Sequence, residues 1–152
     1  MRLTRQPTRR QLLAAGNGLA ALLVVSLARA DPASMASAIA GFTGGPSVTP
    51  GKVSIDIPPL VENGNSVPVT LRVDSPMTVK NFVRSLALFV EKNPQPHAGV
   101  YHFSPRSGRA IVSTRLRLAT SQTLVAIACL SDGSYWSASA DVIVTLAACT
   151  ES

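Results

Sequence analysis

Short runs that alternate between apolar and polar residues fill this chain from Lys52 almost to its carboxyl end. A period of two places the apolar side chains of an extended segment on one face, which is the pattern of a strand with one buried face. The runs recur at intervals of about 8 to 12 residues, separated by Pro, Gly, Asn and Ser turns, and number about seven. This spacing indicates an all-β protein, an immunoglobulin-like antiparallel β-sandwich. An up-and-down β-barrel is the alternative that the pattern leaves open.

Three of these runs have features that affect their interpretation as strands. The run over 66–73 contains Pro68, which cannot donate a ladder hydrogen bond and therefore indicates an edge strand. The stretch over 79–90 fits helical as well as strand spacing, and we interpret 84–91 as a strand because every neighbouring element is one. The last two runs form a hairpin around Asp132 and Gly133. The other strands are expected over 52–57, 100–103 and 109–118.

The hairpin separates the two cysteines of the chain, Cys129 and Cys149. With a two-residue loop, Cys129 lies opposite Trp136, and Cys149 lies about 40 Å further along the second strand. A disulfide needs Cα atoms within about 7 Å, so an intramolecular bond is not expected. We interpret Cys129 as a small core or interface residue, enclosed by apolar neighbours of the hairpin. Those neighbours are Leu124, Leu130 and Trp136.

Cys149 stands three residues from the carboxyl end, after an apolar run. Chain ends fray unless something holds them, so this thiol is expected to be accessible on a flexible tail. We take Cys149 as the functional atom of the chain.

The first thirty residues read as an export signal. Arg9 and Arg10 precede an uncharged, moderately apolar stretch, and Ala28-Arg29-Ala30 is a small-residue cleavage site. The paired arginines indicate twin-arginine export to the periplasm, with an ordinary secretory signal as the alternative. The expected organisation is a signal peptide (1–30), an Ala/Ser/Gly/Pro-rich segment with a short helix over 33–40 and a linker (31–50), the β-sandwich domain (51–146) and a cysteine-bearing arm (147–152).

Removing the leader changes the charge of the chain. The formal net charge of +6 includes five leader arginines, and without the leader the chain has nine basic and eight acidic residues. A nucleic-acid partner needs a clustered basic patch, so none is expected. No apolar segment of membrane-spanning length follows the leader, so we expect no membrane contact in the mature form.

No other set of residues forms a recognisable catalytic or metal centre. His97 and His102 lack acidic neighbours and are interpreted as surface imidazoles, so neither a metal nor a cofactor is expected. Ser107 has no partnered histidine and aspartate, which argues against a hydrolase. Arg115 and Arg117 point outward from one strand and are candidates for weak attraction of a small anion.

Several motifs, in order along the chain, resemble the SoxY family. SoxY is the sulfur-carrier subunit of the periplasmic thiosulfate-oxidising system, and the resemblance extends from Lys52 to Cys149. It implies an immunoglobulin-like domain that pairs with a SoxZ-like subunit and carries sulfur on Cys149 for haem-containing and other Sox enzymes. The motifs are Val61-Glu62-Asn63-Gly64, Val67-Pro68-Val69, Val73-Asp74-Ser75-Pro76-Met77, Lys92-Asn93-Pro94-Gln95-Pro96, Thr114-Arg115-Leu116-Arg117-Leu118-Ala119 and Leu130-Ser131-Asp132-Gly133-Ser134.

The tail departs from the family pattern. Members of the family commonly end in Gly-Gly-Cys-Gly-Gly, whereas this chain ends in Ala147-Ala148-Cys149-Thr150-Glu151-Ser152. Alanine and threonine narrow the backbone freedom that glycine gives, and the Glu151 carboxylate disfavours a thiolate beside it.

Two functions of different classes follow. In the first, the chain is a covalent sulfur carrier rather than an enzyme, and partner enzymes process the sulfur on Cys149. In the second, it is a structural or redox-coupling module whose Cys149 forms an intermolecular disulfide. An enzyme in its own right is the weakest reading, because no acid–base or metal set is present.

The export signal can be tested by replacing Arg9 and Arg10 together with lysine. We expect precursor to accumulate in the cytoplasm, because the twin-arginine receptor reads the arginine pair and not only its charge. Western blotting of cell fractions measures this. Normal periplasmic yield from the double variant would instead indicate the general secretory route.

Overall fold

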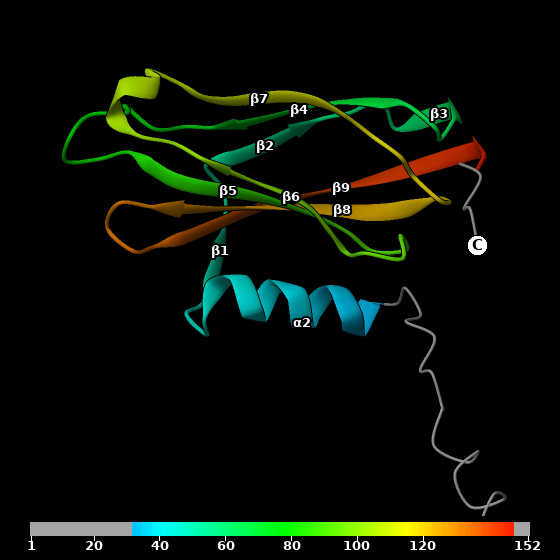
Figure 1. The fold of residues 1–152 in the computed structure, drawn as a ribbon, viewed down its shortest axis with the longest axis horizontal. Helices are drawn as coiled ribbons and strands as arrows, with labels where there is room; N and C mark the ends of the chain where they lie inside the picture. The colour runs from blue at the N-terminus through cyan, green and yellow to red at the C-terminus, as the bar shows by residue number, and fades with distance from the viewer. Residues whose placement is uncertain (1–31, 148–152) are drawn as a thin grey trace, which may run out of the picture.

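The computed structural model describes residues 32–147, and their ribbon is shown in Figure 1. These residues form one α-helix, one short 3₁₀ helix and nine strands. The elements are α2 (Pro32–Thr43), β1 (Val48–Pro50), β2 (Val53–Asp56), β3 (Leu60–Asn63), β4 (Val67–Val73), β5 (Val83–Val90), β6 (His97–His102), η2 (Pro105–Ser107), β7 (Ala110–Leu116), β8 (Gln122–Leu130) and β9 (Tyr135–Leu146).

Two sheets pack face to face, and α2 lies against the outer face of the larger one (Figure 1). The larger sheet has the order β1-β9-β8-β5-β6, with β3 also paired to β9, and the smaller has the order β2-β4-β7. The pairs are antiparallel except β1–β9 and β3–β9, which are parallel. The predicted immunoglobulin-like β-sandwich is confirmed. The additional strands are β1 and β3, two short segments that the sequence pattern did not predict.

The core lies between the two sheets and is built by the alternation seen in the sequence. Every second residue of β4 is buried, from Val67 to Val73, while the residues between them are more exposed. β8 contributes its own alternate residues to the same layer. The residues of these two strands in the layer are Val67, Val69, Leu71, Val73, Leu124, Ala126, Ala128 and Leu130.

Strand β5 is buried on both faces. Leu86 and Leu88 point into the core between the sheets, whereas Ala87 and Phe89 pack under α2. The Phe42 ring of α2 meets the Phe89 ring edge-on, with centroids 6.0 Å apart. A strand covered on both faces has a continuous apolar run, which is why its sequence also fitted helical spacing. Its interpretation as a strand is confirmed.

The prediction that the strand containing Pro68 lies at an edge is wrong. β4 is the central strand of the smaller sheet, between β2 and β7. Its pairing with β2 covers only Thr70 to Val73, whereas its pairing with β7 covers its whole length. Pro68 therefore lies beyond the end of β2, and its missing N–H interrupts no β2 ladder.

The predicted hairpin register is wrong by one residue. Cys129 lies opposite Tyr135, and Trp136 lies opposite Ala128. Gly133 takes a positive φ of 84°, and the Asp132 carboxylate accepts hydrogen bonds from Ser134. A single left-handed glycine after a turn is the pattern of a three-residue loop with a bulge, which adds one residue to the two-residue loop expected.

Cys129 lies on the outer face of the larger sheet. Leu124, Leu130 and Trp136 pack in the layer between the sheets, and Cys129 points away from that layer beside Ile127 and Tyr135. Successive side chains of a strand alternate between its two faces, so Cys129 lies opposite in direction to Leu124 and Leu130, and the enclosure expected for it is wrong. Cys129 is a half-buried free thiol.

Candidate functional site

The candidate site is the end of the sandwich where β9 finishes, because β9 leads directly to the cysteine-bearing arm (Figure 1). Two backbone hydrogen bonds fix this position. The Gly64 N–H donates to the Leu146 carbonyl at 2.8 Å, and the Leu118 N–H donates to the Gly64 carbonyl at 2.8 Å. The last paired residue before the arm is thus joined through Gly64 to the chain that follows β7.

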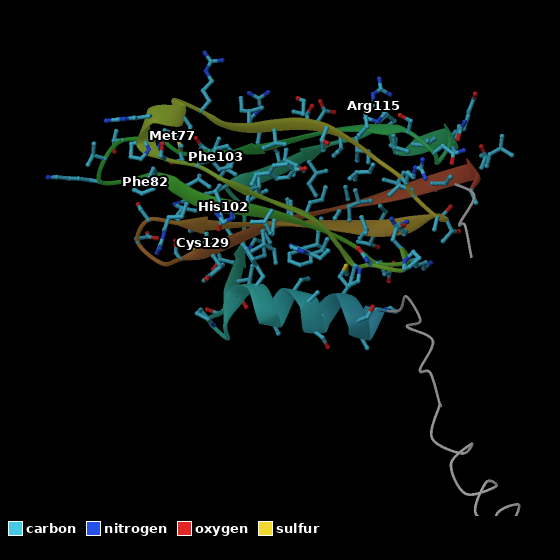
Figure 2. All side chains as sticks on the ribbon, in the orientation of Figure 1. Met77, Phe82, His102, Phe103, Arg115 and Cys129 are labelled. Carbon is cyan, nitrogen blue, oxygen red and sulfur yellow. The ribbon has the colours of Figure 1, made fainter. Side chains whose placement is uncertain are left out.

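The two arginines proposed from the sequence lie at the end of β7 and directly after it, next to Leu118 in the sequence. Arg115 and Arg117 are both exposed, and the Arg115 Nη1 donates to the Ser66 hydroxyl at 3.2 Å. Figure 2 shows Arg115 on the outer side of the smaller sheet. Neither guanidinium is paired with a carboxylate in the interactions of the described residues, so both charges are free to attract an anion.

A pair of amide side chains, the half-buried Asn93 and the buried Gln122, holds the loop between β5 and β6 against the chain that joins β7 to β8. Asn93 donates to the Arg117 carbonyl at 2.7 Å and accepts from the Ala119 N–H at 3.0 Å and from Gln122 Nε2 at 2.8 Å. Gln122, only 4% exposed, accepts from the Lys92 N–H at 2.8 Å. Buried polar groups are stable only when they are hydrogen-bonded, and this pair satisfies that requirement.

An open cavity of about 470 Å³ lies between this loop and β7. Arg115 and Arg117 line one side, and Asn93, Gln95 and His97 line the other. The His97 ring lies against Phe89 with centroids 5.3 Å apart, which orients the imidazole at the rim. Guanidinium, amide and imidazole N–H groups are donors, so the cavity is suited to a small anion.

The structure tests only part of the predicted site. Cys149, Arg9 and Arg10 lie outside the described residues. Arg115 and Arg117 are exposed as predicted, and the structure adds that they lie beside the end of β9. His97 and His102 are exposed, and among residues 32–147 no three His, Cys, Asp or Glu residues gather as metal ligands.

Sequence reasoning missed two positioning residues, Asn93 and Gln122. Asn93 belongs to the Lys92-Asn93-Pro94-Gln95-Pro96 motif, which was interpreted only as a strand break. A signal for Gln122 was its polar side chain at the start of an otherwise apolar strand, a position where burial requires hydrogen-bond partners.

Two apolar side chains are exposed close to the arm. Leu60 of β3 and Ile143 of β9 are register partners, and they are 58% and 59% exposed. Leu146, at the end of β9, is 67% exposed, although the alternation predicted that it would face the core. It lies beyond the last core residues, where no strand of the smaller sheet covers it in the described structure. Exposed apolar side chains that lie together are a candidate surface for contact with another molecule.

Among the described residues no helix is long and apolar enough to cross a membrane.

Comparisons with known proteins agree with this geometry. The family of "Sulfur oxidation protein SoxY" matches residues 39–149. The sulfur carrier protein SoxY from Chlorobium limicola f thiosulfatophilum has a similar structure, with 27% sequence identity and a TM-score of 0.64 over 75% of this chain and 98% of that one. No curated protein sequence matches significantly.

Proteins of another kind share the fold. A superoxide reductase (neelaredoxin) from Ignicoccus hospitalis is 22% identical, with a TM-score of 0.56 over 62% of this chain and 80% of that one. A putative superoxide reductase from Thermotoga maritima is 20% identical, with a TM-score of 0.52 over 68% and 89%. At this level of identity the likeness concerns the fold alone.

Replacing Asn93 with alanine tests the amide pair. The change leaves the Arg117 carbonyl and the Ala119 N–H without their partner, so we expect a loss of about 1 to 3 kcal/mol in the free energy of unfolding. Urea denaturation measures this loss. Asn81→Ala is the matched control, because the Asn81 side chain is exposed and only its backbone is hydrogen-bonded, and it should change stability by less than about 0.5 kcal/mol. Equal effects of the two changes would show that the pair does not hold the loop.

Proposed function

Because the chain belongs to the SoxY family, a family of sulfur oxidation proteins, we propose that it is a covalent sulfur carrier whose attachment residue is Cys149. The family itself supports a carrier role in sulfur oxidation, and the similar protein from Chlorobium limicola is a sulfur carrier. A carrier presents a reactive sulfur to other proteins, so it needs an accessible nucleophile more than a catalytic pocket.

The proposed loading step conserves atoms and charge. The Cys149 sulfur bonds to the outer sulfur of thiosulfate, the thiol loses its proton, and two electrons pass to a haem-containing partner enzyme. The product is a cysteine S-thiosulfonate, which other partner enzymes process. The partners supply the oxidation and the later hydrolysis, and the carrier supplies the thiol.

The position of the β9 end supports this proposal. Leu146 is held by Gly64, and Cys149 follows three residues later, so an extended connection reaches about 10 Å from that anchor. Arg115 and Arg117 lie on the chain segment that is hydrogen-bonded to the same glycine. Sulfur oxyanions are negatively charged, and two unpaired guanidinium groups within range of the arm attract them.

The exposed apolar side chains support a partner subunit. Leu60 and Ile143 lie side by side near the arm, and a SoxZ-like subunit that covers them forms the proposed heterodimer. Burying two branched side chains stabilises such an association by about 1.5 to 3 kcal/mol each. The paired Arg9 and Arg10 support export of the proposed carrier to the periplasm, where haem-containing Sox enzymes would act on it.

The attachment residue can be tested with single cysteine variants. The purified chain is incubated with thiosulfate and the haem-containing partner, and intact-mass analysis then measures the adduct. We expect Cys149→Ser to lose the adduct and Cys129→Ser to keep it. Changing Ala147, Ala148, Thr150 and Glu151 to glycine should raise the yield, because the arm gains backbone freedom and loses a negative charge beside the sulfur. A covalent dimer that reduction removes, with no adduct in any variant, would support the redox-coupling module instead.

The partner surface can be tested with two exposed apolar residues. In co-expression with a SoxZ-like subunit, Ile143→Lys should weaken the heterodimer about tenfold or more, because a charge replaces a buried contact. Val79→Lys is the matched control, since Val79 is 83% exposed and lies in the loop before β5. Size-exclusion chromatography over a dilution series measures the association. Equal behaviour of the two variants would remove Ile143 from the interface, and separate elution of the unaltered subunits would exclude the heterodimer.

A further inference from the structure

A β-bulge places two polar side chains opposite Cys129. In the pairing of β5 with β8, Val83 lies opposite Leu130 and Ser85 lies opposite Cys129, so Arg84 is an extra residue in β5. Val83 and Leu86 are both in the core, and Arg84 and Ser85 both lie between them. Bulges of this kind redirect side chains and are frequent beside functional sites.

Four polar side chains form a row across the adjacent strands β6, β5, β8 and β9, at the position of Cys129. His102 is the register partner of Ser85, Ser85 of Cys129, and Cys129 of Tyr135. Side chains that are direct partners in neighbouring strands lie about 5 Å apart at Cβ. Figure 2 shows Cys129 and His102 together, towards the β8–β9 hairpin and away from the C-terminal end of the sandwich. This row is therefore separate from the site at the end of β9.

The four side chains of this row line an open cavity of about 410 Å³, which α2 does not cover. Helix α2 packs on Ala87, Phe89 and Ile127, two residues along the strands from Ser85 and Cys129. Besides the polar row and Arg84, the cavity is lined by the rings of Phe82 and Phe103. It therefore offers apolar walls together with a cation, a thiol and hydroxyl groups.

Ser85 shows that the cavity suits a ligand. The residue is only 9% exposed, yet its hydroxyl has no hydrogen-bond partner among the described residues. No fully buried side-chain polar atom of the described residues lacks a partner, so the Ser85 oxygen is accessible from the cavity that it lines, where a ligand atom can replace water. Because a hydroxyl can donate, and Arg84 adds a positive charge beside it, the complementary group is an anion.

The thiol is held in a defined environment. Cys129 Sγ lies 3.7 Å from the Leu130 carbonyl, a weak contact that leaves the sulfur available. A hydrogen bond with Cys129 and burial raise the pKa of Tyr135 above its ordinary value of 10.0. The Tyr135 hydroxyl thus keeps its proton at neutral pH and remains a donor, and the edge-on contact of its ring with Phe42 fixes its direction.

We propose that this cavity is a second thiol site, in which Cys129 forms a disulfide with a small anionic disulfide or thiosulfonate whose charged group is bound by Arg84 and Ser85. The Cys129 thiol loses its proton to solvent, and the thiolate bonds to one sulfur of the ligand. The S–S bond of the ligand breaks, and its other half leaves as a thiolate or sulfinate. Bond exchange of this kind needs no external oxidant. The proposal does not depend on the role of Cys149.

Two thiosulfonate reagents of similar size and opposite charge test the proposal. The chain carrying Cys149→Ser is treated with 2-sulfonatoethyl methanethiosulfonate, an anion, or with its trimethylammonioethyl counterpart, a cation, and intact mass gives the labelling rate of Cys129. The urea-unfolded chain corrects for the different intrinsic reactivities. We expect the folded chain to favour the anion by at least about threefold, the scale of an exposed ion pair.

Variants locate the origin of this preference. Arg84→Gln should abolish the preference for the anion, Arg84→Lys should keep part of it, and Ser85→Ala should slow the anion without affecting the cation. Arg72→Gln is the matched control, because Arg72 is exposed on the smaller sheet. Equal corrected rates for the two reagents, absence of Cys129 labelling in the folded chain, or equal effects of Arg84→Gln and Arg72→Gln would overturn the proposal. Because Cys149 is absent from every protein in the experiment, none of these outcomes concerns the carrier function.

Discussion

The apolar layer between the two sheets is the constraint on which the rest of the structure depends. Its side chains come from alternate positions of strands in both sheets, and many of them are completely buried. Burying such a side chain contributes about 1.5 to 3 kcal/mol, so a strand can shift by one residue only at a large cost. The layer therefore fixes which side chains point outward, and both candidate sites consist of outward-pointing groups at positions that the layer determines.

Strand β9 connects this layer to the proposed function. It pairs with β8 along one edge, and with β1 and then β3 along the other. It is paired with β8 as far as Val142 and with β3 as far as Leu146, and the residue proposed to be reactive follows three positions later in the sequence. The strand pairing therefore fixes the point from which this last segment of the chain starts.

The same architecture separates Cys129 from the point where the cysteine-bearing arm begins. Cys129 lies near the hairpin end of β8 and faces away from the core, whereas the arm begins at the opposite end of β9. Their surroundings also differ. Cys129 is flanked by Arg84, Ser85 and Tyr135 in a cavity, and Cys149 is flanked in sequence by small residues and Glu151. The reactivity of a thiol depends on the charges around it, so these two cysteines are in chemically different settings.

The sequence by itself determined the fold class and the positions of the main strands along the chain, because the period of two and the turn residues are local properties of the chain. The family was indicated by the resemblance of its motifs. The sequence also determined that Arg115 and Arg117 point outward, since their apolar neighbours must face the core. Only the tertiary structure decided that Pro68 lies in a central strand, because the length of the neighbouring β2 is not encoded at Pro68. The same is true of the neighbours of Cys129 and Ser85, because the bulged glycine turn pairs Cys129 with Tyr135 and the bulge in β5 sets Ser85 opposite Cys129, and only strand pairing decides both.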